Sequence, residues 1–122
     1  MYRLLLFLIA VAVTAAISVT EAGAQDNYYQ KKAEGYMREA EYYQKKAEGY
    51  RREAVYYMKK ARNYQDEAAY YAKKGDLSRA RTYSRYAEDA MDDYNTQLRY
   101  AAQADDKAAM YMRWAADAMG RI

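Results

Sequence analysis

Residues 28–69 read YYQKKAEGYMREAE, YYQKKAEGYRREAV and YYMKKARNYQDEAA in three consecutive copies, and this stretch decides the fold. A fourth copy begins at Tyr70 with YYAKKG and breaks at Gly75. The repeat is 14 residues long, which equals two heptads of a coiled coil. The stretch lacks the strict alternation of apolar and polar residues that a half-buried strand requires. The pattern therefore predicts a long amphipathic helix.

Within this stretch the apolar residues recur alternately four and three positions apart, which is the spacing of a coiled-coil seam. Alanine takes one of the two core positions and tyrosine takes the other. Small alanines let two helices approach closely, while a tyrosine ring packs on the seam and its hydroxyl reaches water. We call these residues the assembly seam: Tyr29, Ala33, Tyr36, Ala40, Tyr43, Ala47, Tyr50, Ala54, Tyr57, Ala61, Tyr64, Ala68 and Tyr71.

The sequence predicts an all-α fold of two long antiparallel helices that form a helical hairpin or coiled coil. The first helix is expected over residues 27–74, the turn over 75–76 and the second helix over 77–119. Proline, which would interrupt a helix, is absent from the whole chain. Gly35 and Gly49 fall off the seam, so the first helix is either continuous or hinged at these two glycines.

Three residues mark the expected helix ends. Asp26 suits the N-cap of the first helix, because its carboxylate can accept from backbone N–H groups of the first turn. Gly75 suits a left-handed C-terminal cap after two lysines. Asp76 suits the N-cap of the second helix, which starts at Leu77.

The second helix continues the seam with one expected irregularity. Up to Ala101 the seam residues are spaced alternately by three and four positions, and the last of these steps is three. The next step should therefore be four, but the next seam residue, Ala104, comes only three positions later. A missing residue of this kind predicts a local overwinding of the coiled coil. The expected seam is Leu77, Ala80, Ser84, Ala87, Met91, Tyr94, Leu98, Ala101, Ala104, Ala108, Tyr111, Ala115 and Ala118.

The N-terminal segment has the parts of a secretory signal peptide. Arg3 is followed by a largely apolar stretch over residues 4–19, and small residues end the segment at Ala22-Gly23-Ala24. About 20 apolar residues are needed to cross a bilayer as a helix, and this stretch is shorter. We expect cleavage after Ala24, which gives a signal peptide over 1–24, a helical domain over 25–122 and a periplasmic or extracellular location. The alternative is a membrane anchor formed by residues 4–19.

Catalytic chemistry is not expected. The chain contains no histidine and no cysteine, so Ser78 and Ser84 have no imidazole that could activate them. The acidic pairs are interpreted as a solvated face and not as a metal site, because no calcium-loop pattern surrounds them. The sequence therefore predicts a non-enzyme without cofactor, metal or small-molecule substrate. The acidic pairs interpreted as a solvated face are Glu88-Asp89, Asp92-Asp93 and Asp105-Asp106.

Lysine pairs recur once per repeat and define a basic face: Lys31, Lys32, Lys45, Lys46, Lys59, Lys60, Lys73 and Lys74. One interpretation is a ladder of positive charge for an acidic protein or an anionic polymer of the cell envelope. The other is a solubilising face that is partly neutralised by acidic residues of the second helix. A net charge of +3 is too weak to indicate nucleic acid.

Residues 64–87 resemble a tetratricopeptide repeat. The positions that match its aromatic, turn and small residues are Tyr64, Tyr71, Gly75, Asp76, Ala80 and Ala87. The 14-residue period departs from the period of about 34 residues in that family, and Ser84 stands where the motif has an aromatic residue. The resemblance implies a protein-binding scaffold and no catalytic residues.

The first tyrosine of each pair widens the apolar stripe beyond what one partner helix can cover. We therefore expect a homo-oligomer, most simply a dimeric four-helix bundle. Trp114, with Met110, Met112 and Met119 nearby, is expected to serve core packing or a dimer contact in preference to a ligand pocket. The function predicted is an exported, non-catalytic structural or interaction protein that self-associates through the assembly seam. The alternatives are a monomeric tetratricopeptide-like binding module and a membrane-anchored helical stalk.

Overall fold

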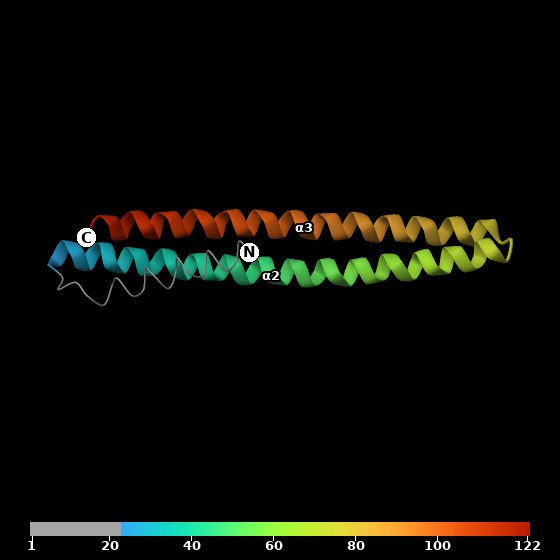
Figure 1. The fold of residues 1–122 in the computed structure, drawn as a ribbon, viewed down its shortest axis with the longest axis horizontal. Helices are drawn as coiled ribbons and strands as arrows, with labels where there is room; N and C mark the ends of the chain where they lie inside the picture. Colours follow the sequence, from blue (N-terminus) through green and yellow to red (C-terminus); the bar gives the residue numbers. More distant parts are fainter. Residues whose placement is uncertain (1–22) are drawn as a thin grey trace. The chain divides into compact units, whose positions relative to one another are not determined.

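The computed structural model describes residues 23–122, and the secondary structure of these residues consists of two long helices. Helix α2 covers Ala24–Lys73 and helix α3 covers Leu77–Gly120 (Figure 1). The predicted all-α fold with two long helices is therefore confirmed. Residues 1–22, which hold nearly all of the predicted signal peptide and the whole of the alternative anchor, lie outside the described residues.

Helix α2 begins three residues earlier than the expected start at Asn27. The Asn27 N–H already donates to the Gly23 carbonyl at 3.0 Å, which is a helical bond to the fourth preceding residue. Asp26 consequently lies inside the first turn, and its assignment as the N-cap is wrong. There its negative charge still favours the positive end of the helix dipole. The helix continues without interruption through Gly35 and Gly49.

The turn after α2 is a Schellman motif. Gly75 has a φ of 80°, in the left-handed region that glycine adopts without steric penalty. Its N–H donates to the Ala72 carbonyl at 3.1 Å, and the Asp76 N–H donates to the Tyr71 carbonyl at 3.0 Å. The Asp76 carboxylate then accepts from the Arg79 N–H at 3.1 Å, which confirms this residue as the N-cap of α3.

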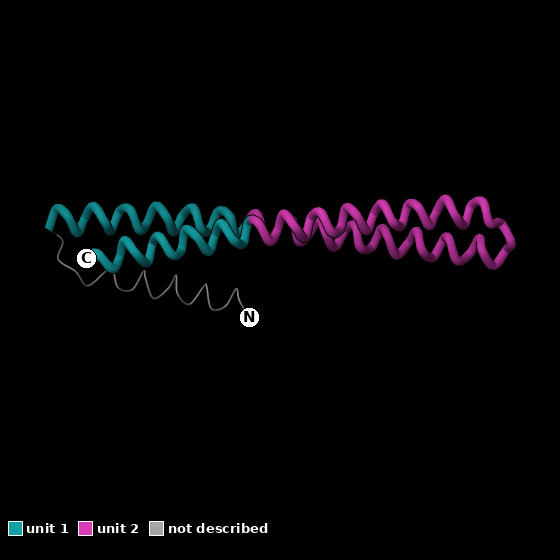
Figure 2. The backbone as a smooth tube through the Cα atoms, turned by 90° about the horizontal axis from the view of Figure 1, so that it is seen from above, with its two compact units in different colours: residues 1–45, 104–122 teal, residues 46–103 magenta. Residues whose placement is uncertain are grey.

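The chain divides into two compact units, which are described separately (Figure 2). Of the described residues, unit 1 contains 23–45 and 104–122, and unit 2 contains 46–103. In both units the α2 and α3 segments run antiparallel. In unit 1, for example, Tyr36 meets Trp114 while Tyr43, further along α2, meets the earlier residue Lys107.

The core of both units consists of alanine. Apart from Met112, every buried hydrophobic residue in the described part of the chain is an alanine, and none of its large side chains is fully buried. Helices that face each other with methyl groups can approach closely, and the larger rings lie along the margins of the contact. The buried alanines of α2 are Ala33, Ala40, Ala47, Ala54, Ala61 and Ala68, and those of α3 are Ala80, Ala87, Ala90, Ala101, Ala104, Ala108, Ala115 and Ala118.

The seam of α3 differs from the expected one in its first half. Ser84 is exposed, Leu77 is 58% exposed and Leu98 is 38% exposed, so assigning these three residues to the buried seam was wrong. Met91 is half-buried but lies beside the seam, and the observed seam begins after Leu77, at Ala80. The positions expected for Ser84, Met91 and Leu98 are taken by the residues that directly precede them in the chain. These are half-buried Tyr83, buried Ala90 and half-buried Gln97.

With these three replacements the four-three spacing of the α3 seam runs unbroken from Ala80 to Ala118. The predicted slip after Ala101 is therefore wrong. At Met91 the expectation chose the larger apolar residue, whereas the smaller neighbour Ala90 is buried in the close contact of the helices. At Ser84 and Leu98 it chose the residue after the true seam position, which Tyr83 and Gln97 occupy.

The corrected seam exposes a second repeat that the sequence interpretation missed. In α3 an arginine, an aromatic residue and a buried alanine recur every 14 residues. The three copies are Arg85-Tyr86-Ala87, Arg99-Tyr100-Ala101 and Arg113-Trp114-Ala115. Both helices therefore share one period, so each repeat of α2 can meet a repeat of α3 in the same way.

Candidate interaction surface

The two kinds of assembly-seam residue are buried to different degrees. The six alanines are between 0 and 9% exposed, and the seven tyrosines are half-buried. In each unit the chain's own α3 covers the alanines. A second chain could reach these methyl groups only if the two helices separated. The surface that remains for a partner is therefore formed by the rings and charges beside the seam.

In unit 1 the seam tyrosines pack on two aromatic residues of α3. The Tyr36 ring lies 5.6 Å from the Trp114 ring and 6.2 Å from the Tyr111 ring, measured between centroids. The Tyr43 ring stacks on Tyr111 at 5.8 Å with the planes only 9° apart. Tyr111 and Trp114 meet edge to face at 5.3 Å. Such offset-stacked and edge-to-face pairs stabilise by about 0.5–1.5 kcal/mol beyond the area that they bury.

Unit 2 contains the same four-ring arrangement. Tyr64 lies 5.4 Å from Tyr86 and 6.2 Å from Tyr83, and Tyr71 stacks on Tyr83 at 5.5 Å with an interplanar angle of 8°. The rings of Tyr83 and Tyr86 meet edge to face at 5.8 Å. Each α2 ring of unit 2 lies 28 positions after its counterpart in unit 1, and each α3 ring lies 28 positions before its counterpart. Two repeats of α2 thus correspond to two repeats of α3.

Two seam tyrosines of unit 1 also face cations of the C-terminal half of the chain. The Arg121 guanidinium lies 5.7 Å from the centroid of the Tyr29 ring. The Lys107 ammonium lies 5.2 Å from the centroid of the Tyr43 ring. Cation–π contacts of this kind contribute about 0.5–1 kcal/mol at exposed sites. They place positive charge beside the rings.

The lysines of the basic face are exposed, apart from Lys60, which is half-buried. In three repeats the second lysine of the pair lies over the ring of the first tyrosine, four residues earlier. The ammonium-to-centroid distances are 5.4 Å for Lys32 on Tyr28, 5.8 Å for Lys60 on Tyr56 and 4.7 Å for Lys74 on Tyr70. The spacing Tyr-Tyr-x-Lys-Lys in every copy could have predicted this contact, because residues four apart are neighbours on a helix.

Two further contacts involve the basic face. The Lys32 ammonium donates to the Tyr28 hydroxyl at 3.4 Å, and this hydrogen bond raises the pKa of Lys32 above its usual value of 10.5. Lys45 forms an ion pair at 3.9 Å with Glu41, which lies four residues earlier on the same helix. In the described part of the chain, Lys32, Lys60 and Lys74 lie against rings and are not in ion pairs with α3 carboxylates.

Large aromatic side chains remain exposed beside the seam. The first tyrosines of the repeats form what we call the outer tyrosine row, and their exposed fractions lie between 50 and 57%. On α3, Tyr86, Tyr100 and Trp114 are exposed by 46, 43 and 42%. These regularly spaced exposed rings make this surface the candidate for an interaction. The outer tyrosine row consists of Tyr28, Tyr42, Tyr56 and Tyr70.

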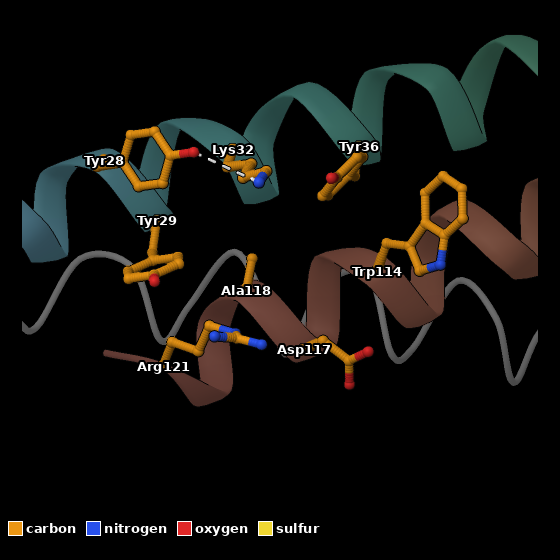
Figure 3. Close-up of a pocket in the computed structure, with 8 residues that line it drawn as sticks. All are labelled: Tyr28, Tyr29, Lys32, Tyr36, Trp114, Asp117, Ala118 and Arg121. Atoms are coloured by element: carbon orange, nitrogen blue, oxygen red, sulfur yellow. Dashed lines mark hydrogen bonds between the residues drawn. The ribbon is translucent and has the colours of Figure 1, made fainter.

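Both units have a hollow between their two helices, and the two hollows lie at corresponding positions of the repeats. The hollow of unit 1 has a volume of about 390 Å³ (Figure 3) and is lined by Tyr28, Tyr29, Lys32, Tyr36, Trp114, Asp117, Ala118 and Arg121. The hollow of unit 2 has a volume of about 160 Å³ and is lined by Lys60, Tyr64, Tyr86, Asp89, Ala90 and Asp93. A shift of 28 positions relates each of these six residues to one in unit 1.

The two hollows differ in charge because of one position. Arg121 of unit 1 corresponds to Asp93 of unit 2, whereas Lys32 corresponds to Lys60 and Asp117 to Asp89. The hollow of unit 1 is thus lined by two cations and one carboxylate, and the hollow of unit 2 by one cation and two carboxylates. The sequence interpretation identified neither hollow, because both depend on the register between the helices.

Among residues 23–122, no group of three or more His, Cys, Asp and Glu side chains is arranged to hold a metal ion. Neither of the two helices contains an apolar stretch that is long enough to cross a membrane. A comparison with known protein families gave no match, and no curated protein or solved structure matched the chain.

Proposed function

We propose that this protein is an exported, non-catalytic structural protein, a helical hairpin that self-associates as a two-fold dimer through the face that carries the hollow of unit 2. The observation that carries this proposal is the distribution of charge around that hollow. Lys60 comes from α2, whereas Asp89 and Asp93 come from α3. Tyr86, which is exposed and comes from α3, also lines this hollow.

A face with lysine on one helix and carboxylates on the other is complementary to itself. In a two-fold dimer the same patch of both copies meets, so α2 of one chain lies on α3 of the other. Lys60 of each chain then meets Asp93 of the other chain, and the contact occurs twice. The exposed rings of Tyr56 and Tyr86 supply apolar area at the centre, where aromatic side chains contribute most to an interface.

The alanine core gives a second reason for association. Alanine buries little area, and the apolar area removed from water is the main stabilising contribution to a fold. A pair of helices whose buried contact consists of methyl groups gains additional burial when its exposed tyrosines are covered. Self-association is therefore expected to stabilise the helices as well as to join two chains.

Charge reversal tests the proposed dimer. Lys60→Glu places a carboxylate opposite Asp93 in both of the equivalent contacts of the dimer. Asp93→Lys places a lysine opposite Lys60 in both contacts. Each variant alone is therefore expected to be monomeric in sedimentation velocity. An equimolar mixture restores both ion pairs and is expected to form heterodimers. This rescue separates contacts between chains from contacts within one chain. Lys32→Glu in unit 1 is the matched control and should leave the dimer intact.

The contribution of the outer tyrosine row of unit 2 to association is tested by the double variant Tyr56→Gln with Tyr70→Gln, which is expected to weaken the dimer. Tyr56→Phe with Tyr70→Phe keeps the rings and should preserve it. A wild-type protein that stays monomeric at all concentrations overturns the proposal and favours the monomeric binding module.

Intact mass of the material released by the exporting cell tests export: a species that still begins at Met1 favours the anchored stalk.

A further inference from the structure

The hollow of unit 1 has features that the proposed dimer does not use. Its volume of about 390 Å³ falls within the range of roughly 300–1,000 Å³ that is typical of small-molecule sites, whereas the hollow of unit 2 is smaller. Tyr36 and Trp114 form an aromatic wall, with centroids 5.6 Å apart, and buried Ala118 lies between the helices beside them (Figure 3). Trp114 is 42% exposed and thus accessible from solvent.

Two cations and one carboxylate surround this wall. Lys32 lies over the Tyr28 ring and Arg121 lies over the Tyr29 ring, so the rings hold both positive groups at the edge of the hollow. Within residues 23–122 neither cation forms an ion pair with a carboxylate. Both are therefore able to bind an external anion. Asp117 supplies an acceptor on the α3 side.

This charge distribution does not suit a second copy of the unit 1 face. A two-fold contact there would bring Lys32 of one chain towards Arg121 of the other, because Arg121 replaces the carboxylate that Asp93 supplies in unit 2. Like charges in direct contact oppose association. The hollow of unit 1 thus favours a ligand that carries negative charge itself.

We propose that the hollow of unit 1 binds an anionic sugar, namely a pyranose ring with a carboxylate, as found in acidic polysaccharides. The apolar C–H face of the sugar packs on the rings of Tyr36 and Trp114 by dispersion. The carboxylate accepts charge-assisted hydrogen bonds from Lys32 and Arg121. Asp117 accepts from a sugar hydroxyl. A ligand without hydroxyl donors gains nothing from this carboxylate, which distinguishes a sugar from a simple anion.

Trp114 provides a reporter inside the site, because it is the only tryptophan of the chain. Titration with trigalacturonic acid is expected to change the tryptophan fluorescence with saturation. Maltotriose has sugar rings without carboxylates, and citrate has carboxylates without sugar rings. Both are expected to bind at least about tenfold more weakly, because each lacks one of the two kinds of contact. Equal affinity for citrate and trigalacturonic acid would show a simple anion site and overturn the proposal.

The charge of the site is tested by Arg121→Asp, which introduces the residue type found at the corresponding position of unit 2. Affinity for trigalacturonic acid is expected to fall by about tenfold or more, as one charge-assisted hydrogen bond is lost and a repulsion is added. Arg85→Asp changes the net charge of the chain equally at an exposed position outside both hollows. An equal loss in both variants would overturn the proposal.

The dimer and the sugar site can fail separately. The proposed dimer depends on Lys60 and Asp93, and the sugar site depends on Lys32 and Arg121. Sedimentation velocity of Arg121→Asp is expected to match the wild-type protein, and circular dichroism should show that the helices are intact. Loss of sugar binding with an unchanged sedimentation coefficient supports the site, whichever result the dimer test gives.

Discussion

Tyr43 and Tyr111 stack with their ring planes 9° apart, and Tyr71 and Tyr83 repeat this geometry in the other unit with planes 8° apart. The two pairs are separated by 28 positions in α2 and by 28 positions in the opposite direction in α3. Such agreement is expected when two helices of equal period run antiparallel, because each step along one helix matches a step back along the other. The stacked pairs therefore fix the register, in addition to burying area.

The stacked pair in unit 2 is expected to contribute a measurable coupling energy. In a double-mutant cycle of Tyr71→Ala and Tyr83→Ala, the two single changes should sum to more than the double change by about 1 kcal/mol. Chemical unfolding followed by circular dichroism measures the three variants. Tyr43→Ala with Tyr83→Ala is the control, because Tyr43 stacks on Tyr111 instead, and these two changes should be additive.

Substituting alanine for Gly49 in α2 and for Gly75 in the turn is expected to change the stability of the protein in opposite directions. Gly49 lies within the helix, and a Cβ there would meet no atom within 4 Å, so Gly49→Ala should stabilise by about 1 kcal/mol. Gly75 has a φ of 80°, which an alanine adopts only at a penalty of about 1–2 kcal/mol, so Gly75→Ala should destabilise. Thermal unfolding compares the two, and the same sign in both would contradict the assigned backbone conformations.

The sequence predicts α2 well because its repeat is nearly perfect. Alanine and tyrosine alternate at the seam without exception from Tyr29 to Tyr71, so a single register satisfies the pattern. The turn is equally clear, since glycine at 75 and aspartate at 76 are suited to the two caps that they form. The sequence defines the start of α2 less sharply, because a helix N-terminus can shift by a turn with little change in free energy.

The register of α3 could not be deduced from hydrophobicity. At three places a large apolar or polar residue stands beside the true seam residue, as Met91 stands beside Ala90. The close approach of the helices buries Ala90 in preference to Met91, and at the other two places Tyr83 and Gln97 are half-buried at the seam. The hollows depend further on which α3 residue faces each tyrosine, and that pairing is a property of two helices together. A search for the Arg-aromatic-Ala repeat of α3 would have supplied the missing register.

Asp76 is expected to stabilise α3 through its N-cap hydrogen bond to the Arg79 N–H, at 3.1 Å. Asp76→Ala removes the acceptor and should lower the free energy of unfolding by about 1 kcal/mol. Asp76→Asn keeps an acceptor at the same place and should change stability little, although it removes the ion pair with the Arg79 guanidinium. If asparagine destabilised as much as alanine, charge and not the cap would be the stabilising factor.

The alanine core is expected to tolerate no enlargement. Ala61 is 1% exposed between the two helices, and a leucine there must force them apart or adopt a strained rotamer. Overpacking of this kind destabilises by about 1–3 kcal/mol. Ala69→Leu is the matched control on the exposed side of the same helix, where leucine and alanine have similar helix propensity. Urea unfolding should separate the two variants clearly. If Ala61→Leu instead stabilised the protein, the added apolar area would have found room, and the close approach of the helices at this position would be refuted.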